Sequence, residues 1–125
     1  MIYRIIVAGS RSFEDYETLK RVLDNYINSI KKENAVIEII GGGANGADRF
    51  GEEYALMRGL PYRLFLPDWK KYKRGAGIVR NREMAQYSSE EIGVLFAFWD
   101  GKSKGTKNMI QTAKRLGLNV YVVDI

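Results

Sequence analysis

Short apolar runs and longer amphipathic segments alternate along the chain, with glycine at most of the junctions between them. Five runs are rich in β-branched or aromatic residues, which is typical of strands buried on both faces of a sheet. These runs are residues 2–8, 36–40, 62–66, 92–98 and 120–123. The segments between them place apolar residues three and four positions apart, which predicts helices that lie against the sheet.

The pattern predicts four helices, one after each of the first four strands. They are expected at about 19–30, from Gly46 or Ala47 to Arg58, at about 78–87 and at about 106–116. Ser12-Phe13-Glu14-Asp15 resembles a capping box before the first helix, and Met57 is expected on the inward face of the second. Gly59 and Gly117 follow helices as C-caps.

Strands that alternate with helices pair in parallel through right-handed crossovers. Residues 1–125 are therefore expected to form a single domain of the α/β class. Its architecture is a three-layer α/β/α Rossmann-like sandwich, with a five-stranded, mostly parallel sheet and four helices.

Composition excludes several kinds of chemistry, because the 125 residues include neither histidine nor cysteine. Ser/His/Asp and Cys/His nucleophile pairs, disulfides and the usual zinc sites cannot be built. No apolar run is long enough to cross a bilayer, and the N-terminus lacks the layout of a signal peptide. We expect a cytoplasmic protein with no membrane partner, no metal and no required cofactor. The net charge of +5 favours phosphate-bearing partners.

Glycines gather after the predicted strands. Nine of the thirteen lie there: Gly9, Gly41, Gly42, Gly43, Gly46, Gly75, Gly77, Gly101 and Gly105. In an open parallel sheet these loops share one edge, where helix N-termini present free amides that bind anions. Each glycine can instead serve a tight turn, but three glycine-bearing loops that converge favour a phosphate-binding pocket.

The stretch from Gly41 to Gly46 also satisfies G-x-G-x-x-G, and Asp68 follows 22 residues later. NAD-type dinucleotide binding is therefore an alternative, although that fingerprint normally follows the first strand of its unit. No Walker A motif is present, since Ala47 and Asp48 follow Gly46. Nucleoside triphosphatase activity is not expected.

Six cations and no acid lie between Lys70 and Arg82. Trp69 and Tyr72 can stack on bases while these cations hold phosphates, so binding of single-stranded nucleic acid through residues 70–82 is a second alternative. The plainer interpretation is a solvated basic loop with its aromatic rings packed beneath it. Residues two apart on a helix point about 200° apart, and we expect Arg80 to face inward and Arg82 outward.

Four motifs together resemble the SLOG superfamily of Rossmann-like proteins, and above all its single-domain YspA-like group. They are Ala8–Arg11, Gly42–Arg49, Arg80–Met84 and Gly101–Thr106. Lonely Guy phosphoribohydrolases and the DNA-processing protein DprA are more distantly similar. The resemblance implies a pocket for a nucleotide-derived molecule, such as a nucleoside monophosphate or an ADP-ribose-like compound. It also implies a homo-oligomer, with a dimer as the first expectation.

Carried over position by position, the resemblance implies the following ligand-binding or phosphate-binding residues: Gly9, Ser10, Arg11, Gly42, Gly43, Asn45, Gly46, Asp48, Arg80, Asn81, Gly105 and Thr106. The Lonely Guy pattern P-G-G-x-G-T-x-x-E ends in a glutamate that serves N-glycosidic hydrolysis, and Met109 stands in that place. A sensor or binding module and a hydrolase both stay open. Asp48 is the tentative catalytic carboxylate, or an N-cap of the second helix. Glu83 is expected in solvent and Asp100 in a turn.

Overall fold

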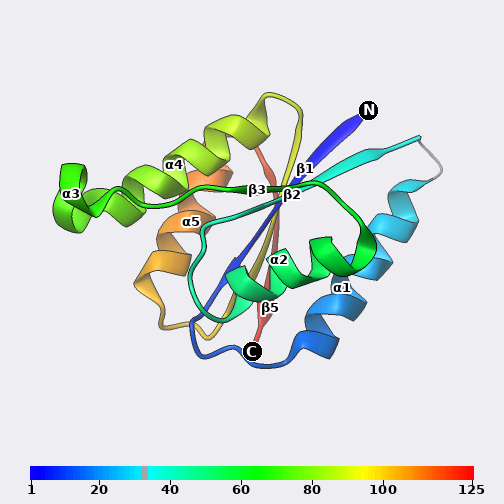
Figure 1. Ribbon diagram of the computed structural model, residues 1–125, viewed down its shortest axis with the longest axis horizontal. Helices are drawn as coiled ribbons and strands as arrows, with labels where there is room; N and C mark the ends of the chain where they lie inside the picture. Colours follow the sequence, from blue (N-terminus) through cyan, green and yellow to red (C-terminus); the bar gives the residue numbers. More distant parts are fainter. Residues whose placement is uncertain (32–33) are drawn as a thin grey trace.

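The computed structural model describes residues 1–31 and 34–125. All strand pairs in its five-stranded sheet are parallel, and the strand order is β3-β2-β1-β4-β5 (Figure 1). The strands are β1 (Ile2–Gly9), β2 (Val36–Gly41), β3 (Tyr62–Leu64), β4 (Ile92–Trp99) and β5 (Asn119–Asp124). The four crossover helices are α1 (Tyr16–Ile30), α2 (Ala47–Arg58), α4 (Ala76–Ser89) and α5 (Lys104–Arg115).

Two apolar clusters, one on each face of the sheet, make up the core. Along β1, alternate side chains enter opposite clusters: Ile5 and Val7 pack with α1 and α2, whereas Ile6 and Ala8 pack with α4 and α5. This alternation is the period of two expected of a strand, and it fixes a helix layer on each side. The predicted three-layer α/β/α Rossmann-like sandwich is confirmed.

The two edge strands differ from the prediction of burial on both faces. β3 is only three residues long, and most residues of β3 and β5 are exposed or half-buried. A strand at an edge has a neighbour on one side only, so apolar composition alone cannot distinguish it from a central strand.

Helix boundaries follow the predicted pattern, with two corrections. Asp15, not Ser12, caps α1, because its carboxylate accepts from the amide of Thr18 at 3.1 Å. Met57 is 75% exposed, so its inward placement was wrong; the buried face of α2 is centred on Tyr54 and Ala55. None of the described helices is long and apolar enough to cross a membrane.

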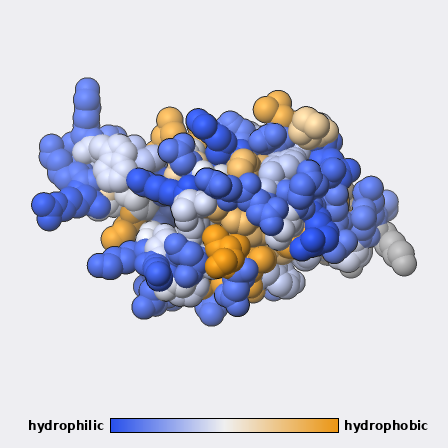
Figure 2. All heavy atoms as spheres, turned by 90° about the horizontal axis from the view of Figure 1, so that it is seen from below, coloured by the Kyte–Doolittle hydropathy of each residue, from blue (hydrophilic) through white to orange (hydrophobic). Residues whose placement is uncertain are grey.

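One extra feature lies between β3 and α4. Residues from the predicted basic loop form a one-turn helix, α3 (Trp69–Tyr72), and a 3₁₀ turn, Lys73–Gly75. Neither contains a buried residue. Figure 1 shows this segment, which we call the basic arm (69–75), projecting beyond the sheet at the left. Figure 2 shows mostly hydrophilic atoms at the same end.

Candidate functional site

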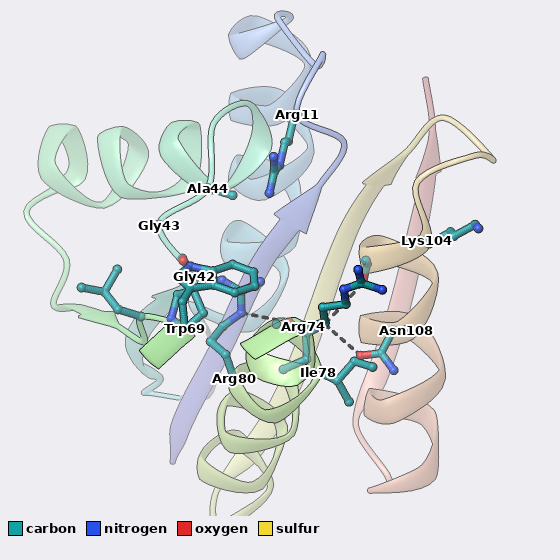
Figure 3. A pocket seen from close by; sticks show the side chains of 15 residues that line it. Arg11, Gly42, Gly43, Ala44, Trp69, Arg74, Ile78, Arg80, Lys104 and Asn108 are labelled. Atoms are coloured by element: carbon teal, nitrogen blue, oxygen red, sulfur yellow. Dashed lines mark hydrogen bonds between the residues drawn. The ribbon is translucent and has the colours of Figure 1, made fainter. Parts of the chain in front are cut away.

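A hollow of about 510 Å³ lies where β1, β2 and β3 end and where α4 and α5 begin (Figure 3). Its wall is built from residues of every one of these segments: Arg11, Gly42, Gly43, Ala44, Leu66, Pro67, Trp69, Arg74, Gly77, Ile78, Arg80, Asn81, Lys104, Gly105 and Asn108. An inner chamber of about 90 Å³ adjoins it and shares Arg11, Ala44, Arg80, Asn81 and Gly105. The rest of the inner wall is Ala8, Gly9, Asp48, Met84, Ser103, Thr106 and Met109.

Most residues predicted to bind the ligand meet at these two cavities, although they are far apart in the chain. The walls contain Gly9, Arg11, Gly42, Gly43, Asp48, Arg80, Asn81, Gly105 and Thr106, and also Trp69. Parallel strands bring the loops at their carboxyl ends to one edge, which is why separate motifs share one hollow.

Four predicted residues lie outside both walls: Ser10, Asn45, Gly46 and Tyr72. Ser10 is buried, and its hydroxyl accepts from the amide of Asp100 at 3.1 Å, which ties the β1 loop to the β4 loop. Gly46 has φ +79°, and a Cβ there would lie 2.4 Å from the Ser10 carbonyl oxygen. Ser10 and Gly46 therefore serve the close packing of the loops at this edge of the sheet.

Arg80 and Asn81 connect the three segments around the hollow. Arg80 donates from Nη1 to the Gly42 carbonyl at 2.7 Å and from Nε to Asn81 Oδ1 at 3.0 Å. Asn81 in turn donates to the Gly105 carbonyl at 3.3 Å and to Asn108 Oδ1 at 2.9 Å. The inward orientation predicted for Arg80 is therefore confirmed, while Arg82 is exposed.

The guanidinium of Arg80 is partly removed from water. Burial lowers its pKa, the nearby Asp48 carboxylate raises it, and the positive charge of Arg11 lowers it further. Arg11 is thus close enough to repel Arg80. An anion between the two arginines would relieve both the repulsion and the loss of solvation.

Asp48 is the buried carboxylate of the inner chamber, only 5% exposed. Burial raises its pKa to about 6, against the opposite effects of Arg80 and of the backbone amides of Ala44, Gly9 and Gly42. Among the described residues it has no cation within 4.0 Å. Gly46 caps α2 without a side-chain bond, so the alternative role of Asp48 as N-cap is wrong.

The glycines of the site are of two kinds. A Cβ on Gly9 would lie 2.4 Å from the Phe98 carbonyl oxygen, and one on Gly42 would lie 2.5 Å from Arg80 Nη1. Close packing requires those two glycines. Gly77 and Gly105 instead lie in the first turns of α4 and α5, without positive φ, and a Cβ there would meet nothing within 4 Å. Glycine within a helix costs about 0.5–1 kcal/mol relative to alanine, and the protein itself gives no steric reason for either one.

Sequence reasoning missed several wall residues, among them Ala44, Leu66, Arg74 and Asn108. Asn108 follows Gly105 by three positions, so helical spacing alone places it on the same face. Arg74 was predicted only as one of the cations of residues 70–82, because the turn that brings it to this hollow was not predicted. Within the described residues, no group of three or more Asp or Glu side chains is placed to hold a metal ion.

Residues 3–72, more than half of the chain, match the sequence profile of the YspA, cpYpsA-related SLOG family. The chain is also 30% identical over 122 residues to the "Gene 61 protein" of Mycobacterium phage D29, which covers 94% of this chain and 93% of that protein.

Among solved structures, the fold is similar to that of DNA processing protein A (DprA) from Streptococcus pneumoniae, with a TM-score of 0.71. The identity is 17%, so this likeness concerns the fold alone; it covers 98% of this chain and 50% of that chain. The family profile, which matches more than half of the chain, shows that the chain belongs to the YspA, cpYpsA-related SLOG family.

Proposed function

We propose that the protein binds a nucleotide or a nucleotide-derived small molecule in the hollow at the carboxyl edge of its sheet. One observation carries the proposal: two arginines without partners point into the same cavity as the first turns of two helices. The side chains of Arg11 and Arg74 make no hydrogen bond or ion pair with any other described residue. Guanidinium groups and helix N-termini are both suited to phosphate.

The phosphate, the sugar and the base of a nucleotide can each contact suitable groups on the walls of the two cavities. Phosphate oxygens fit between Arg11 and Arg80, beside the open amide-bearing turns at Gly77 and Gly105. Hydroxyls of a sugar can donate to the Asp48 carboxylate in the inner chamber. Trp69 is 56% exposed at the mouth of the hollow, where a base can stack on its ring.

Isothermal titration with AMP, NAD and ADP-ribose tests the proposal, together with mass spectrometry of any ligand that co-purifies. We expect at least one of these compounds to bind, and we expect Asn45→Ala to leave its affinity unchanged because Asn45 lies outside both walls. Failure of all three compounds to bind, with no co-purified nucleotide, would remove the proposal.

Binding without turnover is favoured over hydrolysis. Met109, which stands where the Lonely Guy pattern has glutamate, is 1% exposed and lines the inner chamber beside Met84. The position that corresponds to the glutamate of the Lonely Guy pattern is therefore apolar in this protein. Asp48 is the remaining acid on the described walls, and its pKa of about 6 suits general acid or base chemistry. Release of base or sugar by the protein, abolished in Asp48→Asn, would establish a hydrolase instead.

A second candidate function, binding of single-stranded nucleic acid, rests on the basic arm. Its Lys70, Lys71, Lys73 and Arg74 are all exposed, and Tyr72 is 39% exposed. Contacts to several phosphates would weaken steeply with salt, whereas a ligand with one or two phosphates would respond weakly. Fluorescence anisotropy with a labelled oligonucleotide at two salt concentrations separates the two candidates.

Dinucleotide binding in the geometry of the G-x-G-x-x-G fingerprint is less well supported than the other candidates. The carboxylate of Asp68, the acid that would contact ribose in that fingerprint, accepts from the amide of Lys71 at 3.1 Å and so caps α3. It also lies outside the walls of both cavities. The acid available to a sugar is Asp48, which does not occupy the fingerprint position.

Self-association and a cytoplasmic location complete the proposal. The outer edge of β5 is proposed as the surface for a second copy, because β5 ends the described sheet and Val122 is 40% exposed there. Antiparallel pairing of two β5 strands would bring Asp124 of one copy towards Lys114 and Arg115 of the other. Light scattering on a sizing column should give a dimer, and Val122→Lys should give a monomer.

A further inference from the structure

The cations of the outer hollow are more numerous than one phosphate group requires. Arg11, Arg74, Arg80 and Lys104 lie on its wall, and none of the described carboxylates does. Figure 3 shows the three arginines entering from three separate segments, whereas Lys104 points away. A phosphate monoester carries a charge of about −1.5 to −2, so three guanidinium groups exceed what it would neutralise.

The arginines divide into two groups by position. Arg11 and Arg80 are near enough to affect each other electrostatically, and they border the inner chamber that holds Asp48. Arg74 belongs only to the outer hollow and comes from the 3₁₀ turn that leads into α4. In Figure 3 its side chain lies towards α5 and Asn108, to the right of both Arg11 and Arg80.

Cavity size separates the same two regions. The inner chamber, at about 90 Å³, is much smaller than the outer hollow of about 510 Å³, so it can take only a part of a nucleotide. A ligand anchored at Asp48 must therefore extend past Arg80 into the outer hollow of about 510 Å³. Along this path the ligand passes Gly77 and Gly105, where a Cβ would meet nothing within 4 Å.

We infer that the ligand carries two linked phosphate groups, one held by Arg11 and Arg80 and the other by Arg74 at the start of α5. This inference rests on the proposed function, since it concerns the same hollow. The chemical class is a nucleoside diphosphate or a molecule in which a diphosphate bridges two sugars. Asp48, a carboxylate buried in the adjoining chamber, gives the ligand an independent polar contact beyond the helix N-termini.

Titration calorimetry with AMP, ADP and ADP-ribose tests the inference on the intact protein and on two variants. ADP or ADP-ribose should bind at least about tenfold more tightly than AMP. Arg74→Gln should reduce that advantage to about threefold or less, mainly by weakening the diphosphates. Arg82→Gln is the matched control, because Arg82 is exposed on α4 and lies outside both cavities; it should change neither affinity.

The outcomes are distinct. A preference for ADP indicates a terminal diphosphate, a preference for ADP-ribose indicates a bridging one, and either supports the inference. Equal affinities for AMP and both diphosphates, or an equal loss for all three in Arg74→Gln, would overturn it while leaving the proposed function standing. If no nucleotide binds, the proposed function fails first. The Arg74 side chain is exposed and has no hydrogen bond or ion pair with a described residue, so a folded variant is expected.

Discussion

Two cavities at the carboxyl edge of the sheet carry opposite charge. The hollow beside α4 and α5 is lined by cations, whereas a groove of about 760 Å³ beside α1 is lined by Glu14, Asp15, Asp100 and Asp124, with no cation on its described wall. Charge alone would make each of them a candidate ligand site. The two cavities differ in whether their charged side chains already have hydrogen-bond partners within the protein.

In the acidic groove, two of the carboxylates have internal partners. Asp15 accepts from the amide of Thr18, and Asp100 accepts from the amides of Lys102 at 2.8 Å and Ser103 at 2.9 Å. These bonds lower the pKa of both acids. They confirm the predicted turn role of Asp100.

In the basic hollow the arginines differ from these acids. The side chains of Arg11 and Arg74 have no hydrogen-bond or ion-pair partner among the described residues. Asp48 accepts from the backbone amides of Ala44, Gly9 and Gly42, yet its burial raises its pKa to about 6. The ionised Asp48 carboxylate therefore destabilises the fold at neutral pH in spite of these bonds, whereas the bonds of Asp15 and Asp100 lower the pKa of those less buried acids.

The largest expected effect concerns Arg80. Arg80→Gln should weaken nucleotide binding about 100-fold, because it removes a charged contact to phosphate and the bond that holds Gly42. Calorimetry measures the affinity, and circular dichroism verifies the fold. If the variant binds within threefold of the parent protein, the basic hollow is no more a ligand site than the acidic groove.

Asp48 should give the next largest effect, through pH. Its pKa is higher in the folded protein than the ordinary 3.8, so the folded state binds more protons between pH 3.8 and about 6. Its contribution to the free energy of unfolding therefore falls with rising pH across that window, by up to about 3 kcal/mol. Urea unfolding of the parent and of Asp48→Asn at several pH values should show this difference.

Ligand affinity should change with pH in the opposite sense. A sugar hydroxyl that donates to Asp48 favours the ionised carboxylate, so affinity should rise about tenfold from pH 5 to pH 7. Phosphate groups also titrate near pH 6. The pH dependence of affinity in Asp48→Asn measures the contribution of the phosphate groups alone. A pH dependence of affinity that is identical in both proteins would show that Asp48 does not contact the ligand.

A smaller effect is expected from the open glycines. Gly105→Ala should weaken binding about fivefold, because its methyl group would occupy space through which the ligand approaches, while the thermal midpoint stays equal or rises slightly. Gly75→Ala is the matched control: a Cβ there also meets nothing within 4 Å, but Gly75 lies outside both cavities. Equal affinities in the two variants would count against a ligand at the start of α5.

The smallest effect on binding should come from the acidic groove. Asp15→Ala removes the N-cap of α1 and should lower the thermal midpoint by about 3 °C. Nucleotide affinity should stay unchanged, because Asp15 is not on the wall of the basic hollow. A clear loss of affinity would mean that the two cavities are coupled.

The architecture and the set of segments that meet could both be predicted from the local pattern of the chain. Short apolar runs that alternate with amphipathic segments of period 3.6 indicated the order of strands and helices, and parallel pairing then brings the loops after β1 and β2 and the first turns of α4 and α5 to one edge. Helical spacing required Arg80 and Arg82 to point in different directions. The hydrogen bond from Arg80 to Gly42 confirms the choice of Arg80 as the inward one.

Which polar residues the fold uses, and which it leaves available, depended on contacts between distant segments. Ser10 and Gly46 belonged to the same motifs as Arg11 and Gly43, yet Ser10 bonds to Asp100 and Gly46 packs on the Ser10 carbonyl. Arg74 reached the hollow through a turn that no periodicity announced. Hydrogen-bond partners and free space depend on contacts between segments distant in the chain, and a local pattern carries no information on those contacts.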